Sequence, residues 1–448
     1  MSFLIDEFDI FNYTDKEKII INYLSGAMDI VSDEFIYKLK NNLENLNEDE
    51  INILKDRKYL FDSRNEKKKY EDGLYKSLHK KEDLKVPNFL YIPTYQCNFK
   101  CPYCYQETYE ILNENELENN VDSFFKCTEE ILNEFTDKNK VEIKKQDVEI
   151  TLMGGEPLLI ENKKQIHKFL KEVYKREYSL VVITNGYNID FFINELEPKY
   201  IVGVQITLDG SSNVHNKRRI LKNGEKTFDK ILNNIVLLLE KGIKVYIRVN
   251  VDSENIEFLK KLEIEIKEKV KEKEYNIYPY LYLIQDGGCS GNKFVINEIE
   301  YLKKILKNKE NYSFFDVKYH GKNFYESIIN DKMVSFKTKN CASCSKQYIF
   351  DGSGNIYKCW FGVGNPIFKI GEYKKGLNLD KKLDTLWKSR DIHSLKKCID
   401  CKYRFICGGG CLSHIIKSNE DIYKERCINF REIFNFLIQK EIKGMIQN

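Results

Sequence analysis

Short apolar runs alternate with amphipathic stretches through the middle of the chain, between residues 86 and 287. Helical spacing of apolar residues appears between the runs, for example at Asn162–Tyr174 and Thr227–Lys241. Strands that alternate with helices are typical of βα units around a parallel sheet. The predicted strands are Phe89–Pro93, Val148–Met153, Ser179–Thr184, Val202–Leu208, Lys244–Val251 and Ile277–Ile284. These are fewer strands than the eight that close a complete (β/α)8 barrel.

The first 86 residues show a different pattern. Short β-like runs are followed by helical patterns at Asp33–Leu43 and Glu48–Lys55, and then by a charged helical segment at Arg64–Lys81. Short strands followed by helices predict a small α+β module of winged-helix-like type. A plain N-terminal cap is the alternative interpretation.

The charge balance argues against several classes of partner. Lys and Arg number 72 against 69 Asp and Glu, so no strong field points to nucleic acid or to a membrane surface. No apolar run approaches the ~18 residues of a membrane span. The N-terminus has neither the basic nor the apolar region of a signal peptide. We therefore expect a cytoplasmic protein of two or three domains.

The chain contains 13 cysteines, and three of them lie within eight residues. In a reducing compartment, clustered cysteines indicate metal ligands or catalysts. Cys97, Cys101 and Cys104 have the spacing C-x3-C-x2-C and follow the first predicted strand of the middle region. Three thiolates can hold three corners of a four-iron cluster, which normally takes four cysteines, and one iron is then left open for chemistry. A zinc knuckle is the alternative.

This triplet resembles the signature of radical S-adenosylmethionine (SAM) enzymes, in which the residue before the last cysteine is aromatic, as Tyr103 is. The resemblance implies a [4Fe-4S] cluster whose open iron binds SAM. It also implies that one electron cleaves SAM to a 5′-deoxyadenosyl radical. The fold it implies is α/β: a partial (β/α)6 barrel whose strand C-termini face the active site.

Further motifs of this family follow the later strands. Gly154, Gly155 and Glu156 resemble the GGEP motif, which contacts the SAM amino group. Glycines let a main chain approach a ligand closely, and a carboxylate pairs with an ammonium. Other positions that the resemblance assigns to SAM are Asn185, Thr207, Asp209 and Arg248. The alternative role of Asp209 is to cap a turn. Arg218 and Arg219 are alternatives to Arg248 as the partner of the SAM carboxylate.

The C-terminal third carries a second cysteine array, which resembles the SPASM extension of peptide-modifying and protein-modifying radical SAM enzymes. A Gly408–Gly410 turn lies within it. The resemblance implies two auxiliary clusters, hence three [4Fe-4S] clusters in total. The first would be held by Cys344, Cys359 and Cys411, with Cys341 as fourth ligand; the second would be held by Cys398, Cys401, Cys407 and Cys427. A structural zinc at one of these sites is the alternative.

Two cysteines remain outside these sets. Cys127 lies in an amphipathic run and is expected in the core. Cys289 lies in a glycine-rich loop, as a spare thiol or a substrate contact. The predicted domains are 1–86, with leader-peptide recognition as a candidate role, the radical SAM core 87–300, a bridging segment 301–340, and the SPASM domain 341–448.

Within the resembled family, sulfatase maturases carry an aspartate where this chain has Trp360, next to Phe361. Tryptophan cannot act as a base, so this position favours maturation of a Cys-rich ribosomal precursor peptide, with thioether crosslinking as the expected reaction. The aromatic pair would line a peptide groove or pack within the domain. An external electron donor such as flavodoxin or ferredoxin is implied. The alternatives are modification of a protein in the manner of a sulfatase maturase, and a non-enzymatic zinc-binding protein.

Overall fold

The structure is a computed structural model that describes residues 3–4, 7–104, 106, 114–284, 297–307, 312–418 and 420–446. The chain divides into two compact units. The barrel unit comprises Lys85–Tyr319 and Lys346–Lys388, and the cysteine-rich unit comprises Met1–Leu84, His320–Ser345 and Ser389–Asn448. The predicted boundary at residue 86 lies next to a unit boundary, whereas residues 341–448 fall into both units. How function is shared among the four predicted segments stays a prediction.

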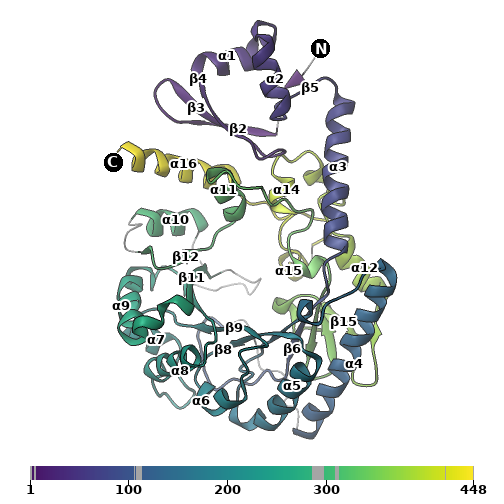
Figure 1. Cartoon of the computed structure of the whole chain (residues 1–448), viewed down its shortest axis with the longest axis vertical. Coiled ribbons are helices and arrows are strands. Elements are labelled where there is room, and N and C mark those ends of the chain that lie inside the picture. Colours follow the sequence, from purple (N-terminus) through teal and green to yellow (C-terminus); the bar gives the residue numbers. More distant parts are fainter. Residues whose placement is uncertain are drawn as a thin grey trace. The chain divides into compact units, whose positions relative to one another are not determined.

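All six predicted strands form neighbouring parallel strands in the barrel unit (Figure 1). They are β6 (Asn88–Ile92), β7 (Glu149–Leu152), β8 (Ser179–Thr184), β9 (Ile201–Thr207), β10 (Val245–Val251) and β11 (Ile277–Leu283). The short β12 (Asp316–Val317) extends the sheet beyond β11. The predicted α/β fold, with six adjacent parallel strands in the middle of the chain, is thereby confirmed.

Amphipathic helices connect these strands and cover the sheet. They include α4 (Glu114–Asn139), α5 (Lys163–Arg176), α6 (Ile189–Phe192), α7 (Ser212–Arg218), α8 (Phe228–Glu240), α9 (Leu259–Val270) and α10 (Glu298–Lys307). In α8, Ile231, Ile235 and Leu238 are fully buried, because positions three and four apart share one face of a helix. Aromatic side chains of α4, α5 and β6 also meet: Tyr91 stacks on Phe169 with ring centroids 5.0 Å apart.

The sheet continues past β6 with strands from the last quarter of the chain, which the sequence did not predict. β13 (Gln347–Asp351) runs parallel to β6, and β14 (Asn355–Tyr357), β15 (Lys369–Glu372) and β16 (Asn378–Leu379) follow it antiparallel. Within the described residues, this sheet has eleven strands. Helix α12 (Lys381–Ser389) follows β16. The Tyr95 hydroxyl donates to Asp351 over 2.6 Å, so β13 also anchors the segment that leads to the cysteine triplet.

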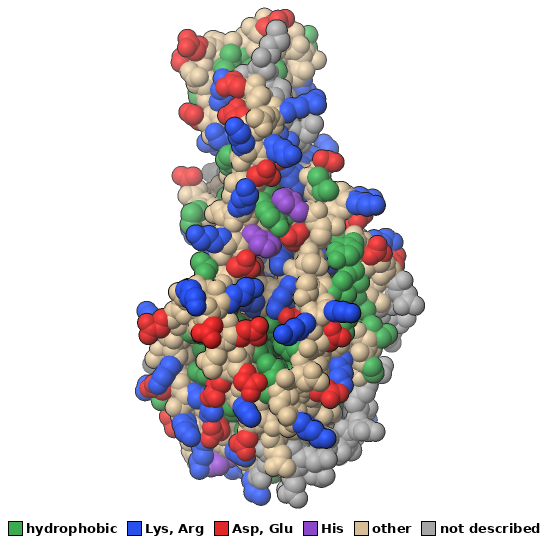
Figure 2. All heavy atoms as spheres, turned by 90° about the vertical axis from the view of Figure 1, so that its right-hand side faces the viewer, with side chains coloured by type: hydrophobic (Ala, Val, Ile, Leu, Met, Phe, Trp, Pro, Cys, Tyr) green, Lys and Arg blue, Asp and Glu red, His purple; other side chains and the backbone are tan. Residues whose placement is uncertain are grey.

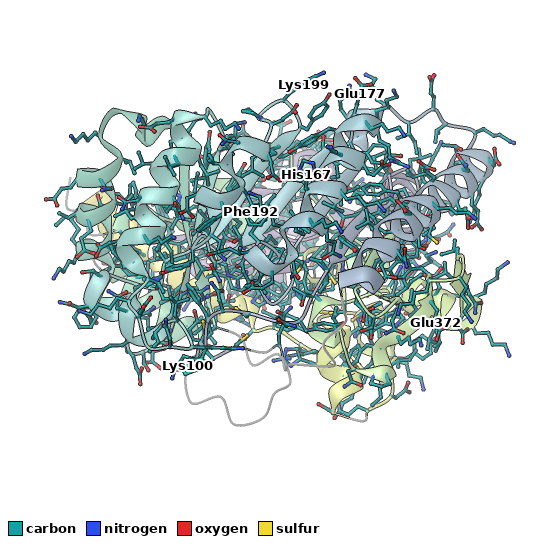
Figure 3. The ribbon with its side chains drawn as sticks, turned by 90° about the horizontal axis from the view of Figure 1, so that it is seen from below. Lys100, His167, Glu177, Phe192, Lys199 and Glu372 are labelled. Atoms are coloured by element: carbon teal, nitrogen blue, oxygen red, sulfur yellow. The ribbon has the colours of Figure 1, made fainter. Side chains whose placement is uncertain are left out.

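The two edges of the parallel sheet can be told apart in Figure 3. Lys100, from the loop after β6, lies at one edge of the barrel unit, whereas Glu177 and Lys199, which precede β8 and β9, lie at the other. The carboxyl ends of parallel strands meet at one edge, where ligands of such sheets bind. The loop that carries the triplet therefore lies at the edge where a site is expected.

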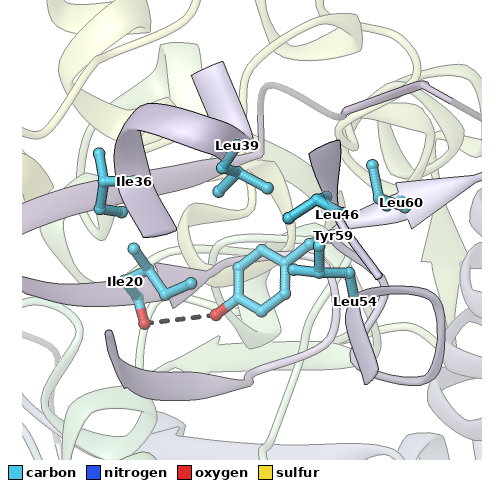
Figure 4. Packing of buried hydrophobic residues seen from close by; sticks show 7 residues of the cluster. All are labelled: Ile20, Ile36, Leu39, Leu46, Leu54, Tyr59 and Leu60. Carbon is cyan, nitrogen blue, oxygen red and sulfur yellow. Dashed lines mark hydrogen bonds between the residues drawn. The ribbon is translucent and has the colours of Figure 1, made fainter. Parts of the chain in front are cut away.

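In the cysteine-rich unit, the N-terminal module is a three-stranded antiparallel sheet packed against two helices. Its strands are β2 (Phe8–Asn12), β3 (Glu17–Asn22) and β4 (Met28–Ser32), and its helices are α1 (Asp33–Asn41) and α2 (Glu48–Asp56). Ile20, Leu39 and Leu54 are buried among the residues of one apolar cluster, and the Tyr59 hydroxyl closes it by donating to the Ile20 carbonyl over 3.3 Å (Figure 4). The predicted small α+β module is therefore present.

A second apolar cluster joins this module to the C-terminal cysteines. It contains Leu24 and Phe61 from the module together with Leu395, Cys398 and Phe405. The remaining elements of the unit are β1 (Phe3–Leu4), β5 (Leu60–Phe61), α3 (Arg64–Asp83), α11 (Lys322–Ile329), α13 (Lys396–Ile399), α14 (Arg404–Cys407), α15 (Leu412–Lys417) and α16 (Phe430–Ile446). Because the module shares a core with Cys398, it is built into the unit that carries most of the second cysteine array.

The surface agrees with the balanced composition. On the face of the molecule in Figure 2, Lys and Arg side chains are interspersed with Asp and Glu. Among the described residues, no helix has the length and apolar character that crossing a membrane requires.

Candidate active site

The triplet lies on the loop after β6, and backbone contacts hold this loop in place. Phe99 forms an isolated bridge with Leu221 and donates its N–H to the Cys97 sulfur over 3.4 Å. The Cys104 N–H donates to the Cys101 carbonyl over 3.2 Å. The thiol of Cys101 interacts electrostatically with those of Cys97 and Cys104. The three predicted ligands are thus gathered on one loop.

A glycine turn after β7 packs directly on this loop. The N–H of Gly155 donates to the Thr94 carbonyl over 3.0 Å, and the N–H of Glu156 donates to the Gln96 carbonyl over 2.7 Å. A Cβ on Gly155 would lie 2.2 Å from the Gln96 carbonyl oxygen, and one on Gly154 would lie 2.7 Å from the Thr94 oxygen. Both contacts are too close for any side chain, so the turn requires its two glycines.

Replacing Gly155 with alanine is expected to destabilise the protein by about 1–3 kcal/mol, because the added methyl group must displace backbone atoms. The matched control is Gly73→Ala in helix α3, where an added Cβ meets nothing within 4 Å. That change should stabilise its helix by roughly 1 kcal/mol. Thermal unfolding of the iron-free chains measures both effects, and equal midpoints for the two variants would contradict the packing described.

Glu156 is buried, with 1 % of its surface exposed, and its carboxylate is already engaged. It accepts from the Thr184 hydroxyl over 2.6 Å, from the Asn185 N–H over 2.6 Å and from the Leu158 N–H over 2.9 Å. Burial raises the pKa of this carboxyl, and the hydrogen bond from Thr184 opposes the rise. The carboxylate therefore ties the ends of β7 and β8 together.

Asn185 lies beside the triplet. Its side-chain amide donates to Asn98 Oδ1 over 2.7 Å, and its Nδ2 is 4.0 Å from the Cys97 sulfur. Thr207, at the end of β9, pairs in register with Arg248 of β10 and is 9 % exposed. Both residues lie at the carboxyl edge of the sheet, as the sequence predicts. Their contact with SAM stays a prediction.

Asp209 is the centre of a buried hydrogen-bond network and does more than cap a turn. It is fully buried, accepts from the Asn250 N–H over 3.1 Å, and accepts from the Tyr103 hydroxyl. Tyr103 also accepts from Arg219 Nη1 over 2.7 Å, and the Asp209 carbonyl accepts from the Asn255 amide over 2.8 Å. The network ties the aromatic residue of the triplet loop to the ends of β9 and β10.

The three arginines proposed for the SAM carboxylate have different surroundings. Arg218 forms an ion pair with Asp252 over 2.8 Å, and Arg248 donates to Asn250 Oδ1 over 2.8 Å. Arg219 instead acts on the triplet, because its charge lowers the pKa of the Cys97 and Cys101 thiols against the larger effect of burial. Its Nε is buried without a hydrogen-bond partner among the described residues. Which of the three arginines contacts the SAM carboxylate stays a prediction.

The residues present fit an iron–sulfur cluster with a bound anion. No three His, Cys, Asp or Glu side chains of the described residues converge closely enough to share a single metal ion. A four-iron cluster separates its thiolates more widely than one ion does, since each thiolate binds a different iron. The three thiols on one loop and the buried unpartnered Nε of Arg219 agree with that group.

A buried histidine next to the Asp209 network makes the stability of the folded protein depend on pH. His215 is fully buried, and its ring nitrogens contact the Asp209 N–H and the Thr227 hydroxyl. Burial first, and then Arg219 and Arg218, lower its pKa well below the ordinary value. As the pH falls through about 6.5, His215 consequently binds a proton in the unfolded chain but stays neutral in the folded chain.

The iron-free protein should therefore lose stability as the pH falls below about 6.5, by up to roughly 1.4 kcal/mol per pH unit from this group. Thermal unfolding midpoints between pH 7.5 and 5.5 measure the loss. The variant His215→Gln should show a shallower pH dependence. An unchanged slope in that variant would assign the loss to other groups.

The second predicted cluster has its four cysteines in the cysteine-rich unit. Burial raises the pKa of the Cys398 thiol to about 12, with further contributions from the neighbouring Cys407, Cys401 and Cys427. The Cys401 N–H donates to the Cys398 carbonyl over 3.2 Å, and Cys407 ends helix α14. Four thiols that act on one another in this way suit the ligand set of one cluster.

The residues assigned to the first auxiliary cluster are divided between the units. Cys341, Cys344 and Cys411 belong to the cysteine-rich unit, and Cys359 belongs to the barrel unit. The hydrogen bond from Cys344 lowers the pKa of the Cys341 thiol to about 5, which favours its thiolate. The Cys411 sulfur lies 3.1 Å from the Ser413 hydroxyl. The ligand set of this cluster stays a prediction.

Comparison with known proteins decides the family of the barrel unit. Residues 91–263 match the model of the radical SAM superfamily. This part of the chain is a radical SAM domain. The predicted resemblance is thereby confirmed, and the protein is an enzyme of the radical SAM type.

Two curated relatives cover most of the radical SAM chain. A cysteine-type anaerobic sulfatase-maturating enzyme of Clostridium novyi is 24 % identical over 77 % of this chain and 93 % of its own length. The radical SAM cyclopropyl synthase TigE of Paramaledivibacter caminithermalis is 22 % identical over 77 % of this chain and 72 % of its own length.

Solved structures share the fold. The structure of native anSMEcpe with bound AdoMet has a TM-score of 0.55 and 19 % identity, and covers 81 % of this chain and 99 % of that one. SuiB of Streptococcus suis bound to the precursor peptide SuiA has a TM-score of 0.53 and 15 % identity, and covers 95 % of this chain and 99 % of that one.

The remaining sequence-based candidates are placed as follows. Cys127 is fully buried in helix α4, as expected of a core residue. Trp360 is 42 % exposed and contacts Phe361 edge-on, so the pair is only partly packed. Cys289 lies outside the described residues. Sequence reasoning missed Asn98, Asn250 and Asn255, for which the sequence offers no signal beyond their position near strand ends.

Proposed function

We propose that this radical SAM enzyme matures a ribosomally made precursor peptide by oxidising it, and that it carries three [4Fe-4S] clusters. The observation that carries the proposal is a second set of four mutually interacting thiols, Cys398, Cys401, Cys407 and Cys427, in the unit that does not contain the triplet. Cleavage of SAM needs one cluster only. Further clusters have a purpose where the substrate loses a second electron, as in an oxidative crosslink.

In this proposal the residues of the barrel unit hold and orient the cofactors. Cys97, Cys101 and Cys104 hold the cluster with one open iron. The backbone of Gly154 and Gly155 faces the amino group of SAM, and Arg219 pairs with its carboxylate through the free Nε. When bound, the cluster and SAM supply a radical that abstracts a hydrogen atom.

The network around Asp209 keeps the reacting groups in position. Its bonds to Tyr103 and Asn250 are buried, where hydrogen bonds are strong and misplacement is costly. Tyr103 thereby fixes the triplet loop against the strand ends that face the cofactor. Asp209 is on this argument a positioning residue.

A peptide substrate is supported by several independent features. The relatives named above include a sulfatase-maturating enzyme and a cyclopropyl synthase, and SuiB was solved with its precursor peptide. Trp360 follows Cys359, and a tryptophan cannot act as the base that an aspartate would supply there. We therefore favour crosslinking of a Cys-rich peptide, with a thioether as the expected bond. An electron donor of the flavodoxin or ferredoxin type completes the system.

The second candidate is modification of a cysteine in a sulfatase. The relative from Clostridium novyi favours it, since 93 % of that protein is covered. The two candidates differ in substrate. A short Cys-rich reading frame beside the gene would favour the peptide, and a neighbouring sulfatase gene would favour the protein.

The test is anaerobic reconstitution followed by incubation with SAM, a low-potential reductant, and synthetic peptides from both sources. The proposal expects about 12 iron atoms per chain, three four-iron clusters. It also expects 5′-deoxyadenosine together with a precursor peptide lighter by two hydrogens. A colourless zinc-containing preparation, or oxidation of the sulfatase peptide alone, would contradict it.

The N-terminal module is proposed to bind the leader part of the peptide. β4 is an edge strand of the three-stranded sheet, and Ile30 on it is 52 % exposed. An edge strand offers free backbone groups to which an extended peptide can add. Ile30→Asp should weaken binding of the full precursor ~tenfold, which corresponds to about 1.4 kcal/mol. Fluorescence anisotropy with the labelled precursor measures this, Gly73→Ala serves as control, and equal affinities would remove the idea.

A further inference from the structure

The two faces of strand β10 differ in burial. One face is fully buried and consists of Val245, Ile247, Val249 and Val251. The other face is half-buried and carries the polar side chains of Tyr246, Arg248 and Asn250. Successive side chains of a strand point to opposite faces, so these three share one surface. Because Asn250 Nδ2 lies 3.5 Å from the Tyr103 hydroxyl, that surface adjoins the candidate active site.

Arg248 is the cation on this polar face, and neutral groups hold its guanidinium. Its Nε donates to Asn250 Oδ1 over 2.8 Å, and its guanidinium carbon lies 4.3 Å from the ring centroid of Tyr282. Burial raises the pKa of Tyr280, and the charge and a hydrogen bond of Arg248 oppose this rise. Among the described residues, no carboxylate forms an ion pair with Arg248. The charge of a partly buried cation is best balanced by an anion.

Side chains of the neighbouring strands extend this face on both sides. Arg248 pairs in register with Thr207 of β9 and with Tyr280 of β11. The Tyr280 hydroxyl donates to Gln205 Oε1 over 2.7 Å, which joins β11 to β9 across β10. Gln205, Arg248, Tyr280 and Tyr282 thus form one half-buried surface, which we call the arginine–tyrosine patch.

The charged groups next to the patch leave its positive charge in place. Asp316 of β12 pairs in register with Tyr280, but its carboxylate forms an ion pair with Lys318. The Lys318 ammonium lies 6.0 Å from the ring centroid of Tyr280. On the side of the triplet loop, the carboxylate of Asp209 accepts from the Tyr103 hydroxyl and from a backbone N–H of β10. The patch therefore favours an anion.

The position of the patch suits a substrate. In the order of strands, β10 and β11 lie on one side of β8 and β9, whereas the triplet loop and the glycine turn follow β6 and β7 on the other side. The arginine that donates to Tyr103 of the triplet loop is Arg219, over 2.7 Å. Cofactor and substrate lie side by side over the carboxyl edge of such a sheet. The ends of β10 and β11 are a part of this edge that the triplet loop and the glycine turn do not occupy.

We propose that the arginine–tyrosine patch is a substrate subsite, in which Arg248 binds the side-chain carboxylate of an aspartate or glutamate in the precursor peptide. This inference rests on the proposed function, which supplies the peptide. A planar guanidinium binds a carboxylate through two parallel hydrogen bonds, and stacking on Tyr282 fixes the plane of Arg248. An acidic residue held there brings a neighbouring residue of the peptide over the active site, so Arg248 determines specificity.

The test measures the binding of short capped peptides to the reconstituted full-length protein, with SAM bound and no reductant. Each peptide contains one cysteine and one aspartate or glutamate, separated by different numbers of alanines, and its matched partner carries the corresponding amide. Because these peptides have no leader segment, a leader-binding site does not contribute to their affinity. Fluorescence anisotropy at constant ionic strength gives the dissociation constants. The variants are Arg248→Gln, Arg248→Lys and Arg248→Glu, and thermal unfolding checks that each is folded.

The matched control is Arg176→Gln. Arg176 ends helix α5 of the same unit, and Glu129 neutralises its charge over 2.6 Å. It precedes Glu177, which lies at the opposite edge of the sheet (Figure 3). This variant should bind every peptide as the native protein does.

The native protein should bind the best acidic peptide ~tenfold more tightly than its amide partner, as expected for one charge-assisted pair. Arg248→Gln should abolish this preference, and Arg248→Lys should keep part of it. Arg248→Glu should instead prefer a peptide in which lysine replaces the acidic residue. An unchanged preference in Arg248→Gln would overturn the inference. If SAM binding weakens in that variant while the preference stays, Arg248 belongs to the SAM carboxylate.

Two further outcomes separate the inference from the function on which it rests. Equal affinity of the native protein for acidic and amide peptides, or binding of neither, would overturn the inference alone. Failure of the native protein to oxidise any precursor peptide would instead refute the proposed function.

Discussion

Replacing Cys97 with alanine is expected to lower the rate of 5′-deoxyadenosine formation at least ~100-fold. Changes to residues that merely support a metal ligand already cost 10–100-fold, and Cys97 is proposed as a ligand itself. The Phe99 N–H and Asn185 contact this sulfur, so the loop is built around it. Alanine leaves the Phe99 N–H without this acceptor and the cluster with two thiolates.

The measurement is chromatography of the products after anaerobic incubation with SAM and reductant, together with an iron count. The matched control is Cys127→Ala, in which a cysteine is removed from the core of helix α4. Its thiol lies 3.9 Å from the Tyr373 carbonyl and is assigned to no cluster. The control should keep its iron and its deoxyadenosine. Undiminished product from the Cys97 variant would contradict the whole assignment of the active site.

The sequence predicts the core of the barrel unit because its signals are local. Each predicted strand is found within one or two residues, since buried parallel strands are continuous apolar runs. The triplet and the glycine turn were also recognisable, because each is defined by residue types at a fixed spacing within a few positions of the chain. The need for glycine at Gly155, in contrast, follows from contact with the loop that the triplet occupies, and the structure is required to show it.

The sequence did not predict which distant segments pair as neighbouring strands. β13 lies beside β6, although more than 250 residues separate them, and a five-residue apolar run does not specify its neighbour. The surroundings of the candidate arginines could not be predicted for a similar reason. Arg248 is on a strand end, and its side chain contacts Asn250 and Tyr282, whereas the charge of Arg219 lowers the pKa of the Cys101 thiol. Side-chain direction depends on packing that no motif encodes.

Helix α3 shows an intermediate case. Its charged composition predicted a helix, and Tyr70, Leu74 and Leu78 form a stripe at four-residue intervals. What the stripe covers could not be predicted. It packs on the apolar cluster that contains Cys398, so the N-terminal residues support the second cysteine array.

Removing cysteines from the second array is the other change for which we expect a large effect on peptide oxidation. The double variant Cys398→Ala, Cys401→Ala is expected to lose about four of ~12 iron atoms. Deoxyadenosine should still form, because Cys97, Cys101 and Cys104 are untouched. Formation of oxidised peptide should fall at least ~100-fold, as for loss of any essential metal group.

Peptide oxidation should fall in this variant because the electron released by the peptide needs an acceptor. An oxidised peptide loses two hydrogens: one leaves as a hydrogen atom, and the other leaves as a proton with an electron that needs an acceptor. Without the second cluster the electron has no path away from the peptide radical. The radical then takes up an electron from the added reductant and a proton from water, which restores the starting peptide. SAM is consumed without product, and the ratio of deoxyadenosine to modified peptide rises.

Mass spectrometry of the peptide and chromatography of deoxyadenosine, measured in one reaction, give this ratio directly. The Cys127→Ala protein is again the control for loss of a buried thiol. Cys398 also belongs to an apolar cluster, so the folded state of the double variant is checked by thermal unfolding. A folded double variant that lacks these irons and still oxidises the peptide at the native rate would show that the second array is structural and that the electron leaves by another route.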